Sequence, residues 1–141
     1  MRLMQNTTTL DDATVKEALE FVAPPGVSGD VMLRKTSGTL AGYAYWKGSS
    51  YHASARPFVT LRVGDGFPRG PRPPVGPGYL PTPALGSRVE ALVYLAAHEL
   101  RHLWQARVPR GRRVWGARGQ FSERDADAYA IRMLRKWRRE H

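Results

Sequence analysis

Two histidines and a glutamate in the middle of the chain have the spacing of a metal site. They are His98, Glu99 and His102, in the order H-E-x-x-H. On a helix His98 and His102 share a face, because residues four apart are neighbours there. Both imidazoles then face one small cation, while Glu99, offset by about 100°, suits a base that acts on water beside the metal. The alternative is a pair of hydrogen-bonded core histidines.

The residues around this motif predict a helix over about 88–107. Ser87 and Glu90 fit a capping box at its start, and Pro109 and Gly111 end it. Between them apolar residues recur at helical spacing: Val89, Leu92, Val93, Ala96, Leu100, Leu103 and Trp104.

A third ligand is needed, because a catalytic zinc usually has three protein ligands and one open position. The chain has no cysteine. A second helix is predicted over about 123–139, with Ser122 as its N-cap and an apolar stripe at Ala126, Tyr129, Ala130, Met133 and Trp137. Glu123 is well placed to be the third ligand, with Asp125 or Asp127 as substitutes. Asp127 also suits a partner for the second nitrogen of a ligand histidine. The alternative is that these acids only favour the helix dipole.

The two motifs together carry a resemblance to known peptidases. H-E-x-x-H followed by Glu123-x-x-x-Asp127 resembles the gluzincin branch of zinc metallopeptidases, and Glu123-x-x-Ala126-x-x-Tyr129-Ala130 is similar to the ImmA/IrrE-type phage and stress-response metallopeptidases. The resemblance covers about residues 87–137, and residues 1–86 show no family signature. The 20 residues between His102 and Glu123 fit a minimal zincin better than a thermolysin-like enzyme.

This resemblance implies a zincin fold, Zn2+ and hydrolysis of a peptide bond in a protein or peptide substrate. It implies His98, His102 and Glu123 as ligands, Glu99 as the general base, and Asp127 behind a ligand histidine. The residues Tyr79 and Tyr129 are candidate donors to the oxyanion that forms during hydrolysis.

The composition indicates a single domain, 1–141, with one core. The chain has 141 residues, of which 42% are hydrophobic. No apolar run approaches the 20 or so residues of a membrane span, and the first residues lack the apolar stretch of a signal peptide. The expected location is the cytoplasm.

The charge is strongly positive, with 22 Lys and Arg against 12 Asp and Glu. Such a field attracts nucleic acid or acidic protein surfaces. Arg110, Arg112 and Arg113 are candidate nucleic-acid contacts, and Trp115 and Trp137 could stack on bases. Two alternatives explain the positive charge without a binding role. Cations suit helix C-termini, and a GC-rich genome can enrich arginine without function. A competing function is therefore a basic nucleic-acid-binding or phage structural module whose zincin site is inactive or structural.

The N-terminal half predicts a helix and a small sheet. The helix begins at Asp11 or Asp12 and ends at Val22, before Pro24 and Pro25. Strands are predicted at 31–35, 40–46, 51–55 and 58–63, with turns at 36–39 and 47–50. The expected class is α+β: a minimal zincin-like domain whose small, mostly antiparallel sheet packs on the H-E-x-x-H helix and a C-terminal helix. The resemblance implies that an edge strand, 58–63 or 40–46, lines the cleft.

Residues 64–86 predict a long loop, because 6 Gly and 7 Pro among 23 residues leave no room for a regular element. The loop leads directly into the predicted metal-binding helix. It is expected to form a wall or lid of the cleft, or to be a passive linker.

Overall fold

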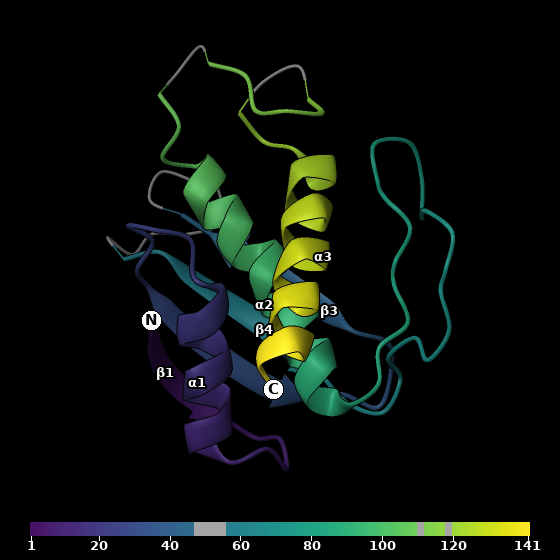
Figure 1. The fold of residues 1–141 in the computed structure, drawn as a ribbon. Helices are drawn as coiled ribbons and strands as arrows, with labels where there is room; N and C mark the ends of the chain where they lie inside the picture. The colour runs from purple at the N-terminus through teal and green to yellow at the C-terminus, as the bar shows by residue number, and fades with distance from the viewer. Residues whose placement is uncertain (47–55, 110–111, 118–119) are drawn as a thin grey trace.

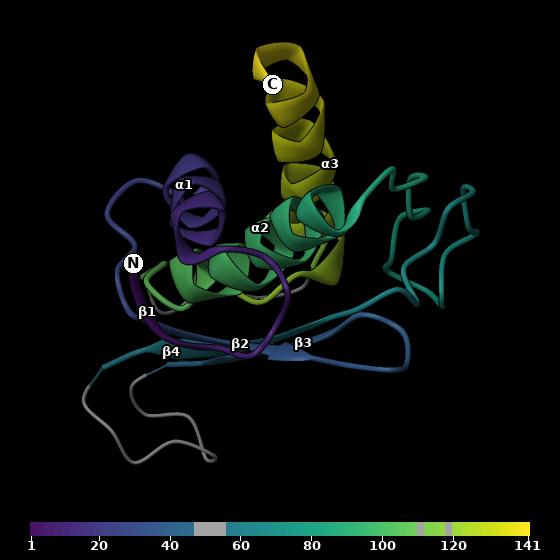
Figure 2. The same cartoon turned by 90° about the horizontal axis from the view of Figure 1, so that it is seen from below.

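The computed structural model describes residues 1–46, 56–109, 112–117 and 120–141, and in these it has three helices on one face of a four-stranded sheet (Figure 1). The expected α+β class, with a small sheet and a C-terminal helix, is confirmed. Figure 2 shows the layers. The central helix, residues 88–105, lies along the sheet, and the C-terminal helix, residues 123–140, packs on the face of the central helix that is opposite the sheet.

The sheet is mixed, so the expectation of a mostly antiparallel sheet is wrong. Its order is β1 (Arg2–Asn6), β2 (Asp30–Lys35), β4 (Phe58–Val63) and β3 (Ala41–Tyr45). β1 and β4 each run parallel to β2, and only β3 is antiparallel to β4. The helix between β1 and β2 carries the chain back to the end of the sheet at which β1 began, so that β2 runs parallel to β1. β4 then inserts between β2 and β3, so the turn at 36–39 does not join paired strands.

β1 was not expected from the sequence. It has five residues, and its side chains are exposed or only partly buried, so no apolar run marks it. The predicted strand 51–55 and turn 47–50 lie outside the described residues. The predicted strand 58–63 coincides with β4.

The first helix, α1 (Asp12–Val22), matches its prediction. Asp11 caps it by accepting a hydrogen bond from the backbone N–H of Thr14 at 2.7 Å. The residues that it buries are those of the predicted apolar face: Val15, Ala18, Leu19 and Val22.

The two helices that carry the motifs are α2 (Arg88–Gln105) and α3 (Glu123–Glu140). Ser87 caps α2 through the N–H of Glu90 at 3.1 Å, and Ser122 caps α3 through the N–H of Asp125 at 3.0 Å. Glu90 accepts from the N–H of Gly86 rather than from Ser87, so only half of the expected capping box forms. No helix among the described residues is long and apolar enough to cross a membrane.

The 64–86 loop projects beyond one end of the sheet (Figure 2). As expected, it contains no helix or strand. Arg72 and Thr82 form an isolated bridge within it by exchanging two backbone hydrogen bonds of 2.9 Å. Phe67 and Leu85 fix the two ends of the loop, because both side chains are buried in the core. The loop is therefore anchored where it meets α2.

Candidate metal centre

The ligand atoms of His98, His102 and Glu123 converge where α2 meets the first turn of α3. The Nε2 atoms of the two histidines are 3.2 Å apart. The Oε2 atom of Glu123 is 3.0 Å from Nε2 of His98, and its Oε1 atom is 3.2 Å from Nε2 of His102. Ligand atoms about 2.1 Å from a tetrahedral ion lie about 3.4 Å from one another. Two imidazoles and a carboxylate at these separations fit zinc.

A buried carboxylate fixes the orientation of His98. The Nδ1–H group of His98 donates to Oδ1 of Asp127 at 2.9 Å, which leaves Nε2 to face the other ligands. The other oxygen of Asp127 accepts from the backbone N–H of Leu80 at 2.9 Å. Asp127 therefore occupies the position predicted for it, and it also ties the 64–86 loop to the site.

A buried amide fixes the orientation of His102. The Oε1 atom of Gln105 is 2.8 Å from Nδ1 of His102, and it also accepts from the backbone N–H of Ser122 at 3.1 Å. The amide nitrogen of Gln105 donates to the carbonyl of Ser122 and to Asp125, at 2.8 and 3.0 Å. These partners place the oxygen toward His102, so Nδ1 carries the proton and Nε2 offers its lone pair.

Sequence reasoning missed Gln105. Its side chain is fully buried. One signal could have found it: Gln105 is a polar residue three positions after His102, on the same buried face of α2.

Asp125 is not placed as a ligand, although it was a candidate substitute. Its carboxylate accepts from Nε and a terminal nitrogen of Arg101, at 2.7 and 3.2 Å. Among the other histidines, His52 lies outside the described residues, and His141 pairs with Glu17 at 2.8 Å. Glu123 is thus the acid that reaches both histidines.

Glu99 is buried beside the ligands without joining them. Its side chain is 8% exposed, and its Oε1 atom is 4.0 Å from Nε2 of His98. Burial raises the pKa of Glu99, and the charges of Glu123 and Asp127 raise it further, against the opposite effect of the histidines. A carboxylate with a raised pKa, next to the metal position, is suited to accept and release a proton.

The electrostatic environment favours positive charge where the ligand nitrogens meet. In the metal-free site burial disfavours protonated His98, but Asp127 and Glu123 outweigh this and raise its pKa to about 10. Burial also opposes protonation of His102, and Glu123 again raises the pKa. The pKa of Glu123 is lowered by its hydrogen bonds to His102 and His98. A cation at this point gains the same attraction, and it competes with the protons for Nε2.

The edge strand β3 borders Glu99. A Cβ atom at Gly42 of β3 would lie 2.7 Å from Cγ and 2.9 Å from Oε1 of Glu99. Of the two strands expected to line the cleft, 40–46 therefore contains the one at the site, whereas 58–63 forms the interior strand β4.

Two cavities meet at the candidate site. One, of about 400 Å³, contains the ligand residues and Glu99 and is walled by Tyr43, Trp46 and Tyr79. The other, of about 390 Å³, shares Gly42, His98 and Glu99 with the first; it continues along α2 and the 64–86 loop past Leu40, Pro68, Val75 and Leu95. Glu99 thus borders both cavities.

The two tyrosines proposed as oxyanion donors have different positions. Tyr79 lines the cavity with the ligands, and the charge of Glu123, burial and the charges of Asp127 and Glu99 raise its pKa, so its hydroxyl keeps its proton. The hydroxyl of Tyr129 donates instead to the carbonyl of Val22. Tyr129 is therefore engaged elsewhere, and its prediction as an oxyanion donor is wrong.

Two of the three arginines proposed to contact nucleic acid, Arg112 and Arg113, lie apart from this site. Arg112 and Arg113 line a different cavity beyond the C-terminal end of α2, and Arg110 lies outside the described residues.

Comparisons with protein-family models, with curated proteins and with solved structures find no match for this chain. The chemistry of the site is therefore inferred from its own side chains. These are two oriented imidazoles, one carboxylate across from them, and one buried carboxyl group that lies outside the ligand set.

Proposed function

We propose that this chain is a zinc-dependent peptidase that cleaves a peptide bond in a protein or peptide substrate. His98, His102 and Glu123 hold the zinc, and Glu99 is the general base. The observation that carries the proposal is the convergence of three ligand atoms with Glu99 buried beside them and outside the ligand set. This division into three ligands and one free carboxylate is typical of catalytic rather than structural zinc sites.

Each side chain has a defined task in this chemistry. A zinc ion held by His98, His102 and Glu123 would supply a Lewis acid, which lowers the pKa of water toward about 7 and polarises a carbonyl group. Glu99 takes a proton from the attacking water and returns it to the nitrogen of the leaving amine. Tyr79 donates a hydrogen bond to the developing oxyanion. Asp127 and Gln105 hold the imidazoles in the tautomer that keeps Nε2 free.

The sheet supplies a place for an extended substrate. β3 is paired with β4 on one side, and it is the last strand of the sheet in the described part of the chain. The outermost strand of a sheet offers backbone donors and acceptors to another extended chain. A substrate paired there would pass Gly42, and therefore Glu99.

The test compares zinc-loaded wild-type protein with two variants, using an unfolded protein mixture and mass spectrometry of the products. Glu99→Gln should retain zinc, because Glu99 is not a ligand, and should reduce hydrolysis to background. His102→Ala should lose both zinc and hydrolysis. Equal zinc loss in the two variants would show that the role given to Glu99 is wrong.

A second function is favoured by one observation, the excess of positive charge. Arg112 and Arg113 are exposed, and the whole chain has a net charge of +10. This favours a basic nucleic-acid-binding or phage structural module in which the metal site is inactive or structural. Zinc-loaded protein that cleaves no peptide in a broad library, yet binds nucleic acid, would support this alternative. The cytoplasmic location remains a prediction under both functions.

A further inference from the structure

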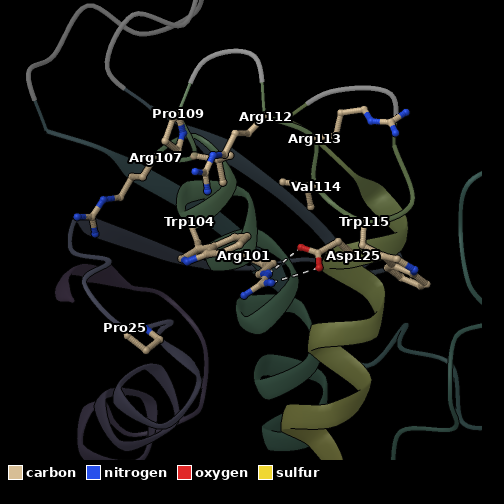
Figure 3. A pocket seen from close by; sticks show the side chains of 11 residues that line it. Pro25, Arg101, Trp104, Arg107, Pro109, Arg112, Arg113, Val114, Trp115 and Asp125 are labelled. Atoms are coloured by element: carbon tan, nitrogen blue, oxygen red, sulfur yellow. Dashed lines mark hydrogen bonds and ion pairs between the residues drawn. The ribbon is translucent and has the colours of Figure 1, made fainter.

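A third cavity, of about 590 Å³, lies at the C-terminal end of α2 (Figure 3). It is enclosed by the C-terminal end of α2, the chain that follows it, and Pro25. We call it the arginine–tryptophan cavity after the residues that line it: Arg101, Arg107, Arg112, Arg113, Trp104 and Trp115.

The charges around this cavity are unbalanced. Asp125 neutralises Arg101 through hydrogen bonds of 2.7 and 3.2 Å. Arg112 and Arg113 are exposed, and no acid in the described part of the chain forms an ion pair with either. In Figure 3 Arg112 extends toward Trp104, whereas Arg113 extends outward from the loop. Arg112 therefore offers a guanidinium group to an anion inside the cavity, and Arg113, which also lines it, offers a second group from its outer side. Arginine recognises phosphate with several donors at once.

The aromatic side chains supply flat surfaces close to these charges. Trp115 is 60% exposed. Trp104 is covered on one face by the guanidinium of Arg101, whose central carbon is 3.6 Å from the ring centroid. An exposed tryptophan beside unpaired arginines is suited to stack on a planar base whose phosphate binds the arginines.

We propose that the arginine–tryptophan cavity binds a nucleotide unit, either as a free nucleotide or as part of a single-stranded nucleic acid. Arg112 and Arg113 bind the phosphate, and Trp115 stacks on the base. An acidic peptide fits less well, because its carboxylates would use the arginines but leave the tryptophan without a planar partner. This proposal is independent of peptidase activity.

The cavity is separable from the metal centre by mutation. The two share Asp125, which contacts both Arg101 and Gln105. Within the described residues, Arg112 and Arg113 form no hydrogen bond or ion pair with any of these three residues. Replacing both arginines should therefore leave the zinc content unchanged, which provides a check that the variant is folded.

The experiment titrates the zinc-loaded full chain with a labelled oligothymidylate, with thymidine monophosphate, with inorganic phosphate and with polyglutamate. Fluorescence anisotropy follows the oligonucleotide, and calorimetry follows the unlabelled probes. The double variant Arg112→Gln/Arg113→Gln should weaken oligonucleotide binding at least about tenfold and reduce its dependence on salt. The matched control Arg135→Gln/Arg139→Gln removes the same charge from exposed positions on α3, away from the cavity, and should change the affinity by less than about threefold. Trp115→Ala should weaken binding of the oligonucleotide and the monophosphate without affecting inorganic phosphate.

The probes also separate the two sources of the ligand. Equal affinity per site for the monophosphate and the oligonucleotide would identify a free nucleotide, and much tighter oligonucleotide binding would identify a strand. The proposal would be overturned by absence of nucleotide and oligonucleotide binding at low salt, or by equal losses in the two double-arginine variants. Polyglutamate binding as tight as the oligonucleotide, or unchanged binding by Trp115→Ala, would overturn it as well.

Discussion

The side chain of Glu99 lies directly against the backbone of Gly42, in a space that only glycine leaves open. A Cβ atom at residue 42 would come within 3.0 Å of three Glu99 atoms, Cγ, Oε1 and Cδ. The edge strand β3 and the side chain of Glu99 therefore restrict each other's position. This contact joins two segments that are more than fifty residues apart in the sequence.

Gly42→Ala should displace Glu99 and leave the zinc ligands in place. Hydrolysis should fall by about 100-fold, because a shift of about 1 Å in a reacting group has an effect of this size, whereas zinc content should not change. The matched control is Gly70→Ala, since a Cβ at Gly70 meets nothing within 4 Å. Activities of the two variants that agree within error would show that the contact does not position the base.

Gln105→Leu should weaken zinc binding by about 10–100-fold, because it removes the acceptor that holds the Nδ1 proton of His102. Zinc affinity is measured by competition with a chelator. Gln120→Leu is the control: Gln120 donates to backbone carbonyls of Gln105 and Val108 and has no contact with the histidines. An equal loss of zinc affinity in the control would assign the effect to packing of the chain between α2 and α3.

Tyr79→Phe should lower kcat by about 100-fold with little change in KM, as removal of one oxyanion donor does. The comparison is Tyr43→Phe, which removes a hydroxyl from the wall of the same cavity. Steady-state kinetics on one peptide substrate measure both constants. If Tyr43→Phe loses kcat and Tyr79→Phe does not, the oxyanion donor has been assigned to the wrong tyrosine.

The ion pair between Glu90 and Arg138 should make stability depend on pH. It joins the start of α2 to the end of α3. The Arg138 guanidinium lowers the pKa of Glu90, with a smaller contribution from the Gly86 N–H and against the effect of burial. Since the pKa is lowered on folding, the stabilisation is complete above the ordinary pKa of Glu and is lost as pH falls through the folded value.

Glu90→Gln should therefore lower the free energy of unfolding by up to about 1 kcal/mol at neutral pH, because Arg138 is largely exposed. The difference from wild type should shrink as the pH falls from about 7 to about 3. Urea unfolding at several pH values measures it, with Glu140→Gln as the control for loss of an exposed carboxylate. A difference that grows on acidification would contradict this ion-pair assignment.

The helices, and the placement of His98 and His102 on one helix face, were predictable because the sequence signals for them are local. The periodicity of α2 and α3, their serine caps and the i, i+4 spacing of His98 and His102 all lie within single segments. The approach of Glu123 to both histidines also follows once α3 packs on α2.

The remaining features depend on contacts between distant segments, which one sequence does not specify. The insertion of β4 between β2 and β3 is a choice of strand partners, and β1 is a mostly polar edge strand with no apolar pattern. The contact of Gly42 with Glu99 requires the position of β3 relative to α2. The Tyr129 hydroxyl was predicted to donate to an oxyanion, but it donates to the carbonyl of Val22, which is more than a hundred residues away in the sequence.

The most direct test of the central claim is the zinc content of the purified full chain after metal removal, refilling and dialysis, measured by mass spectrometry. Wild-type protein should hold about one zinc per chain, and Glu99→Gln should hold the same amount. Glu123→Ala should hold much less, because it leaves only the two histidines as ligands. Wild-type protein that remains folded and retains no zinc, or Glu123→Ala that retains as much as wild type, would contradict the proposed centre.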